Sequence, residues 1–276
     1  MHQPSEQAPL MITAAICGAE VFRDQTPYVP YSPSELADEA VRCSEAGATM
    51  VHLHVREADG RPSQRAELFA ETMALIQARC PILIQFSTGG AVGMTVAERA
   101  DALRLRPDMA TLTTGSVNFG EDIFANAAPM VRQIASRMME FGVRPEIECF
   151  DTGMVETALR LAKEGAIPSP NHFNLVMGMA GGMGGTAHHL DFVRTLLPAD
   201  CTWSVAGIGR FELPLAERAI ALGGHVRVGL EDNVYLSKGI LAKGSYELVQ
   251  AVATLAQQAR RPLATVAQAR QMLHLG

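Results

Sequence analysis

Eight short apolar runs alternate with eight longer amphipathic runs along this chain of 276 residues, and this alternation constrains its fold more than any other feature. The apolar runs have the length of strands, and the amphipathic runs have the length and apolar spacing of helices. The expected strands are Leu10–Cys17, Met50–Val55, Ile82–Ser87, Met109–Thr114, Pro145–Phe150, His172–Gly178, Thr202–Ile208 and His225–Leu230.

Start and stop signals support the helices between these strands. Ser32 stands three residues before Glu35, and Thr95 three residues before Glu98, which is the spacing of a capping box. Glycines suited to a left-handed terminating position follow several of the runs. The expected helices are Ser34–Ala46, Ala66–Arg79, Val96–Leu105, Ala128–Phe141, Met154–Glu164, Ala187–Leu197, Leu213–Leu222, Ser245–Arg260 and a last short one at Thr265–Leu273.

Strand-then-helix units in a row predict parallel strands joined by right-handed crossovers, and eight such units close a (β/α)8 TIM barrel. The alternative is an open doubly wound sheet, but no Gly-x-Gly-x-x-Gly follows the first strand to suggest a dinucleotide fold. No linker or shift in composition marks a second domain. We therefore expect one α/β domain over residues 1–276, with a short N-terminal extension (1–9) and a C-terminal helix (265–273).

Composition limits the classes of partner. The formal net charge is −6 with scattered Lys and Arg, which argues against nucleic acid, and no apolar run is long enough to cross a membrane. The N-terminus lacks a secretory signal pattern. The five cysteines are widely spaced with no Cys-x-x-Cys, which favours reduced thiols in a cytoplasmic protein. Cys17 and Cys149, near strand ends, are the two to consider as catalytic or metal-bound.

His52 and His54 stand two residues apart in the apolar segment Met50–Val55. Residues two apart on a strand project from the same face, with Cα atoms about 6.5–7 Å apart, so both imidazoles can converge on one metal ion. Two purely structural buried histidines would each need hydrogen-bond partners, which makes that alternative costly. A carboxylate would complete a catalytic zinc site with one open position. Spacing does not choose among five acids near strand ends: Glu20, Glu148, Asp151, Glu231 and Asp232.

Arg227 and Asp232 lie on and just beyond the eighth expected strand, at the barrel end where active sites of this fold lie. They form either a structural ion pair or a functional one, in which Arg227 orients Asp232 and favours its charged form. A carboxylate base beside a metal-polarised carbonyl is the arrangement that removes a proton α to that carbonyl.

Two glycine-rich segments, Ser87–Gly90 and Gly178–Gly185, follow expected strands and precede helices. Their backbone N–H groups can hold a carboxylate or a phosphate, or the glycines can simply form tight turns. Five glycines in Gly178–Gly185 favour a pliable binding loop there.

Five segments in the same order resemble the β-keto acid cleavage enzyme family, whose founding activity is 3-keto-5-aminohexanoate cleavage. They are Ile12–Glu20, Val51–Arg56, Gln85–Gly90, Thr111–Asn118 and Gly229–Asn233. The resemblance runs from Leu10 to the C-terminal helix. It implies a (β/α)8 barrel, a homotetramer and a catalytic Zn²⁺. The segment Gly178–Gly185 departs from the family pattern, because it lacks a proline before the double glycine.

The same resemblance assigns roles to residues. It selects Glu231 as the third metal ligand beside His52 and His54, and it implies Asp232 as the base, assisted by Arg227. The positions that match those holding the keto acid are Glu20, Ser87, Gly90 and Thr111, with Thr113 and Ser116 as nearby candidates.

The reaction that the resemblance implies is an acyl transfer with cleavage of a carbon–carbon bond. A β-keto acid and the co-substrate acetyl-CoA give acetoacetate and the CoA ester of the shortened acid, through an enolate, transfer of CoA and a retro-Claisen cleavage. The alternative on the same scaffold is a metal-dependent keto-acid aldolase or lyase that needs no CoA. A metal-sensing or keto-acid-binding protein without turnover is a rival from another class.

Overall fold

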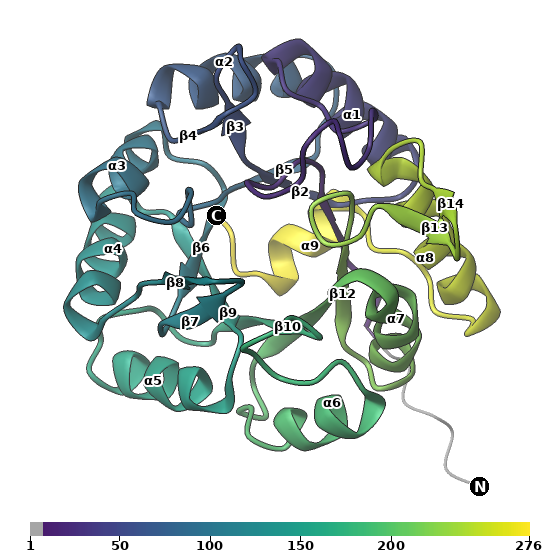
Figure 1. Ribbon diagram of the computed structural model, residues 1–276. Coiled ribbons are helices and arrows are strands. Elements are labelled where there is room, and N and C mark those ends of the chain that lie inside the picture. Colours follow the sequence, from purple (N-terminus) through teal and green to yellow (C-terminus); the bar gives the residue numbers. More distant parts are fainter. Residues whose placement is uncertain (1–7) are drawn as a thin grey trace, which may run out of the picture.

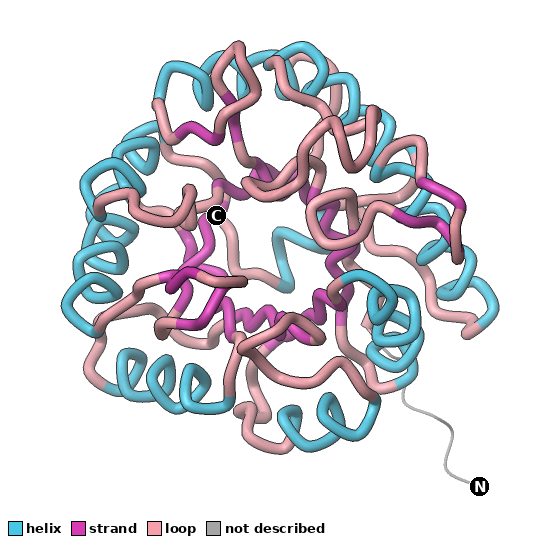
Figure 2. The backbone as a smooth tube through the Cα atoms, viewed as in Figure 1, coloured by secondary structure: helices cyan, strands magenta, loops and turns pink. Residues whose placement is uncertain are grey.

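The computed structural model describes residues 8–276. Eight parallel strands form a closed barrel in the order β1-β12-β11-β10-β9-β6-β5-β2, and helices surround it (Figures 1 and 2). The predicted (β/α)8 fold is therefore confirmed, and the open sheet is excluded. The barrel strands are β1 Ile12–Ala15, β2 Met50–Leu53, β5 Leu83–Phe86, β6 Met109–Thr113, β9 Arg144–Cys149, β10 His172–Met177, β11 Thr202–Gly207 and β12 His225–Val228.

The helices follow the strands as the amphipathic runs predict. Ser32 and Thr95 form capping boxes with Glu35 and Glu98, and Gly142 ends its helix with a left-handed φ of 69°. One expected helix, Val96–Leu105, is divided into an α-helical and a 3₁₀ part. The helices are α1 Pro33–Glu45, α2 Ala66–Gln77, α3 Val96–Asp101, η1 Ala102–Leu105, α4 Ala128–Phe141, α5 Thr152–Lys163, α6 Ala187–Arg194, η2 Gly209–Phe211, α7 Glu212–Ala221, α8 Ser245–Gln258 and α9 Val266–Met272.

Seven of the eight barrel strands are shorter than expected because barrel pairing ends before the apolar runs do, and β9 has the expected length but begins one residue earlier. Leu10 bridges to Leu263 and stands apart from β1. His54 lies one residue beyond β2, and Leu230 two residues beyond β12. The side chains at the carboxyl ends of the strands therefore come from the first residues of the loops as well as from the strands themselves.

Three small antiparallel sheets were not expected, because strands of two or three residues are too short to show a periodicity. They are built from the loops after the barrel strands and lie on the carboxyl side of the barrel (Figure 1). They pair β3 Val55–Arg56 with β4 Pro62–Ser63, β7 Val117–Phe119 with β8 Asp122–Phe124, and β13 Tyr235–Ser237 with β14 Ile240–Leu241.

The opposite end of the barrel is closed by the C-terminal segment. Ala269 and Leu273 of this segment pack on Met11, Met50 and Met109 at the amino ends of three strands. Figure 1 shows α9 across the barrel opening, so the carboxyl end is left for a site. The expected N-terminal extension, residues 1–9, lies almost wholly outside the described residues. Within residues 8–276, no helix has the length and apolar character needed to cross a membrane.

Candidate active site

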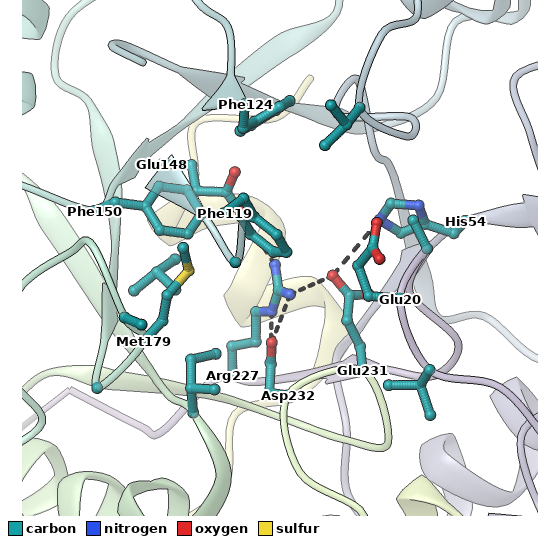
Figure 3. A pocket seen from close by; sticks show the side chains of 18 of the residues that line it. Glu20, His54, Phe119, Phe124, Glu148, Phe150, Met179, Arg227, Glu231 and Asp232 are labelled. Carbon is teal, nitrogen blue, oxygen red and sulfur yellow. Dashed lines mark hydrogen bonds and ion pairs between the residues drawn. The ribbon is translucent and has the colours of Figure 1, made fainter. Parts of the chain in front are cut away.

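A pocket of about 460 Å³ opens at the carboxyl ends of the barrel strands (Figure 3). Its polar lining includes Glu20, His54, Glu148, Arg227 and Asp232, which come from four of the barrel strands and the loops that follow them. A barrel of this kind places loop residues that are distant in sequence around one opening.

His52, His54 and Glu231 form a compact group beside this pocket. The two imidazole rings are 5.1 Å apart between centroids, and each Nε2 lies 3.5 Å from Oε1 of Glu231. One ligand atom from each residue can be chosen so that all lie within 4.8 Å of one another. The second oxygen of Glu231, Oε2, is buried and has no hydrogen-bond partner. Two imidazole nitrogens beside a carboxylate with an unsatisfied buried oxygen form a donor set that fits a divalent cation.

The other candidate ligands are placed differently. Glu148 and Asp232 face Arg227, and Asp151 caps helix α5 through the N–H of Gly153. Burial raises the pKa of the Cys17 thiol to about 11 and that of Cys149 to about 12, so neither is held as a reactive thiolate. Glu231 is therefore the acid that the geometry joins to the histidine pair.

A hydrogen-bonded chain inside the barrel orients His52. Nδ1 of His52 lies 2.7 Å from Oε1 of Gln85 on β5. Nε2 of Gln85 lies 3.9 Å from Sδ of Met50 and faces the carboxylate of Glu146 on β9, which pairs with His172 at 3.3 Å. Burial raises the pKa of Glu146, but the nearby donors His172 and Gln85 outweigh this and leave the pKa below its usual value.

This chain determines which nitrogen of His52 faces the pocket. An ionised Glu146 only accepts hydrogen bonds, so Gln85 must turn its NH₂ group toward Glu146 and its carbonyl toward His52. Nδ1 of His52 then carries the proton, and Nε2 keeps a free lone pair toward Glu231. Sequence reasoning missed this role of Gln85, although its parity with His52 across the paired strands β2 and β5 is a usable signal.

Arg227 is shared by two buried carboxylates, Glu148 and Asp232, and the partly buried carboxylate of Glu231. It donates two hydrogen bonds of 2.9 Å to Asp232, one of 2.6 Å to Glu231 and one of 3.3 Å to Glu148 (Figure 3). Thr113 donates to the other oxygen of Glu148 at 2.7 Å. One cation therefore faces three acids, and the group has an excess of negative charge that a divalent cation would offset.

The adjacent acids Glu231 and Asp232 have pKa values shifted in opposite directions. Burial raises the pKa of Asp232 to about 6, and the opposing effect of Arg227 does not cancel it. The expectation that Arg227 favours the charged form was right in sign, but burial prevails. For Glu231, burial also raises the pKa, yet Arg227 and the two histidines together hold it well below its usual value. Glu231 is thus a permanent carboxylate, whereas Asp232 can exchange a proton near neutral pH.

The loop that carries both acids is held from several sides. Gly229 approaches the carbonyl of Ala15 so closely that any side chain would collide with it. The N–H of Gly229 and the amide of Asn233 both donate to Glu212 at 2.9 Å, and the N–H of Leu230 donates to Ser245 at 3.0 Å. The positions of Glu231 and Asp232 are therefore determined by their supporting contacts.

The residues matched to keto-acid binding fall into two groups. Glu20 and Gly90 line the pocket. The other four are not among the described residues that line it, and each makes a local hydrogen bond: Ser87 accepts from Gly89 N–H, Thr111 from Thr88 N–H and Ser116 from Asn126 N–H, while Thr113 donates to Glu148.

Apolar side chains form the remaining wall of the pocket. Phe119 and Phe124 come from the β7–β8 hairpin, Phe150 follows β9, and Met179 lies in the glycine-rich loop (Figure 3). Sequence reasoning missed this hairpin, whose signal is a glycine at position 120 between two short runs with Val117, Phe119, Ile123 and Phe124.

The glycine-rich loop is anchored by backbone hydrogen bonds. Gly178 N–H donates to the carbonyl of Met183, and Met183 N–H donates to the carbonyl of Phe150, both at 2.8 Å. A Cβ atom on Gly181, Gly182 or Gly185 would collide with Asn118, Phe150 or Phe211. The glycines therefore let this loop pack closely on its neighbours and form one side of the pocket.

Comparison with known proteins finds a matching family. Residues 9–275 match the model of a family described as beta-keto acid cleavage enzyme. The chain is 49% identical over 268 residues to 3-keto-5-aminohexanoate cleavage enzyme of Fusobacterium nucleatum, covering 96% of this chain and 98% of that protein. It is 43% identical over 271 residues to 3-oxoadipate:acetyl-CoA acetyltransferase of Cupriavidus necator, covering 97% and 95%.

Solved structures agree on the fold. The apo structure of ObcA superposes with a TM-score of 0.80 at 22% sequence identity, and the match covers 91% of this chain and 66% of that one.

Proposed function

Because this chain belongs to the β-keto acid cleavage enzyme family, we propose that it converts a β-keto acid and acetyl-CoA into acetoacetate and the CoA ester of the shortened acid. The observation that carries the proposal is the position of Asp232. Asp232 is a buried carboxylate with a pKa of about 6. It accepts hydrogen bonds from Arg227 and lies directly beside the group formed by His52, His54 and Glu231.

His52, His54 and Glu231 would hold Zn²⁺, which when bound supplies Lewis acidity toward the keto group of the substrate. The chain's own residues do the rest. Arg227 fixes the orientation of Asp232, and Gln85 keeps Nε2 of His52 free for the metal. Phe119, Phe124 and Phe150 exclude water from one side of the pocket.

Asp232 acts as the base of the reaction. It takes a proton from the carbon between the keto and carboxylate groups, and that carbon then attacks the thioester of acetyl-CoA and releases CoA thiolate. The thiolate attacks the original keto carbon, the bond between the two acyl halves breaks, and the electron pair passes to the acetoacetate fragment. Asp232 returns the proton to that fragment. A base with a pKa near the working pH serves both transfers.

The pocket favours a substrate with a cationic substituent. Glu20, Glu148, Glu231 and Asp232 line it, against Arg227 alone among cationic side chains of the described lining. Glu20 is exposed at the pocket and has no ion pair among the described residues. A second carboxylate on the substrate would be repelled there, and an ammonium group attracted. We therefore propose 3-keto-5-aminohexanoate as the substrate, the compound named for the Fusobacterium relative.

One assay separates this proposal from its rivals. Purified protein with Zn²⁺ is incubated with 3-keto-5-aminohexanoate, with and without acetyl-CoA, and acetoacetate and the new CoA ester are measured. We expect both products only when acetyl-CoA is present. Cleavage without CoA would establish the aldolase or lyase alternative, and binding without any turnover would establish a sensor or binding protein.

Two further properties complete the proposal. We propose a homotetramer, which light scattering after size-exclusion chromatography tests. The five cysteines are all free, and this supports the proposal of a reducing, cytoplasmic location.

A further inference from the structure

The carboxyl face of the barrel has few cationic side chains that lack a carboxylate partner. Arg23, Arg61 and Arg65 on this face form ion pairs, and Arg56 and Arg99 are buried and donate to carbonyl groups. Among the described residues of this face, the exposed cations without an ion pair belong to the two loops that follow β11 and β12. They are Arg210, Lys238 and Lys243, and all three are exposed.

Two of these cations line one groove. Its volume is about 570 Å³, and it is lined by Arg210 and the start of α7 on one side and by Lys238 and the β13–β14 hairpin on the other. Leu213, Pro214 and Tyr235 give it an apolar floor and an aromatic ring that is 48% exposed. We call these lining residues the α7–hairpin groove.

The groove adjoins the active-site pocket. Ile208 and Asp232 line the pocket, and the residues that follow each of them, Gly209 and Asn233, line the groove. A hydrogen bond of 2.8 Å from Gly209 N–H to the carbonyl of Asp232 ties the two loops together. A long ligand can therefore place one end beside Asp232 and extend its other end across these loops into the groove.

Acetyl-CoA is a ligand of this shape and carries several phosphate charges at its nucleotide end. Those phosphates would be repelled by the acids of the active-site pocket and by a chain with a net charge of −6. Arginine and lysine are the side chains that bind phosphate, arginine through its planar fork. The loops after the seventh and eighth strands, here β11 and β12, are also the frequent phosphate site of (β/α)8 barrels.

We propose that the α7–hairpin groove binds the phosphate-bearing nucleotide end of acetyl-CoA, with Arg210 and Lys238 on the phosphates and Tyr235 against the base. This inference rests on the proposed function. It assigns the co-substrate a second contact region, separate from the residues that perform the chemistry.

The test compares two thioesters in the double variant Arg210→Ala/Lys238→Ala. We expect the KM for acetyl-CoA to rise at least tenfold with kcat almost unchanged, because charged hydrogen bonds to the phosphates are lost. With S-acetyl-N-acetylcysteamine, which has the thioester but no phosphate, kcat/KM should equal that of the wild type. The matched control is Lys163→Ala/Arg194→Ala, which removes two exposed cations from the C-terminal ends of α5 and α6 at the opposite end of the barrel.

Other outcomes would overturn the proposal. An unchanged KM for acetyl-CoA excludes a role for the two cations. An equal loss of kcat/KM with both thioesters indicates that the substitutions disturb the Asp232 loop, and this also overturns the phosphate contacts. If the wild type does not use acetyl-CoA at all, the proposed function fails. Calorimetric titration with adenosine 3′,5′-bisphosphate then tests nucleotide binding to the groove separately. Tighter binding to wild type than to the double variant would support a nucleotide site in the groove, and equal or absent binding would exclude it.

Discussion

Arg227 grips Asp232 through both carboxylate oxygens, with Nε and Nη2 each donating at 2.9 Å. The same Nη2 also donates to Glu231 at 2.6 Å. The proposed base and the proposed metal ligand therefore share one rigid cation. The guanidinium holds the two carboxylates in a defined position relative to each other.

Asp232→Asn should abolish turnover and leave metal binding intact. The amide keeps the size of the side chain but cannot accept the substrate proton, and general-base catalysis contributes about 10²–10⁴-fold. Acetoacetate formation and zinc content are measured on the same preparation. Full activity in this variant would remove Asp232 from its role as base.

Arg227→Met should destabilise the fold by about 3–5 kcal/mol, because it leaves buried carboxylates without their cation. Urea unfolding in the presence of a chelator measures this. Arg218→Met is the matched control: Arg218 makes the same forked contact with Asp191, but the pair is about 40% exposed, so its loss should leave the free energy of unfolding almost unchanged. An equal loss of unfolding free energy in the two variants would contradict the statement that burial makes the Arg227 contacts more important for stability.

His52→Ala should abolish stoichiometric zinc binding, since two ligands of the three would remain. The wild type should gain thermal stability when zinc is added, and the variant should not. His188→Ala, which removes an exposed histidine, controls for zinc held at the surface. A variant that still carries stoichiometric zinc would refute the ligand set.

Gln85→Leu should weaken zinc binding by about 10–100-fold, because the proton on Nδ1 of His52 loses its acceptor. Competition with a chromophoric chelator gives the affinity, and ¹⁵N NMR of the histidine rings gives the tautomer. Gln64→Leu is a suitable control, since Gln64 is also buried but contacts the carbonyl of Ser87 and no metal ligand. Equal affinities in wild type and Gln85→Leu would dismiss the orienting role.

His225 should make the fold sensitive to acid. Burial, with help from His172 and Arg261, holds its pKa well below 6.5, and its Nδ1 accepts from the N–H of Met11. Below about pH 6.5 the unfolded chain binds a proton at this histidine that the native state refuses, so stability falls as pH falls, by up to about 1.4 kcal/mol per pH unit. Urea unfolding is measured between pH 7.5 and 5. The free energy of unfolding should fall less steeply with falling pH for His225→Asn than for wild type, and His188→Asn should show the wild-type dependence on pH.

The fold was readable from the sequence because each unit is specified locally. Helix α4, Ala128–Phe141, was predicted to the residue, since Gly142 ends it with a left-handed conformation. The hairpins β3–β4 and β13–β14 were not readable, because such short strands show no period, and β7–β8 was signalled only by the glycine at position 120 between two short runs. The ends of the strands were overestimated because barrel pairing, which no local pattern contains, decides where a strand stops.

The site was only partly readable for the same reason. The spacing of His52 and His54 indicates a metal pair by itself, but Glu231 could not be selected by spacing from among five acids. The pKa of Asp232 depends on burial from all sides, which sequence distance to Arg227 does not contain. Gln85 looked like an ordinary strand residue until the pairing of β2 with β5 placed it beside His52.

The strand order of the barrel has a consequence for how the protein is made. His52 and His54 belong to β2 and its following residue, Glu231 follows β12, and β1 pairs with both strands. The metal group therefore bridges the seam where the first and last parts of the polypeptide meet. No half of the barrel contains it, so a growing chain on the ribosome can acquire a metal site only after β12 has been synthesised and the ring has closed. An ion bound there would link the first and last parts of the barrel and stabilise the ring against opening between them.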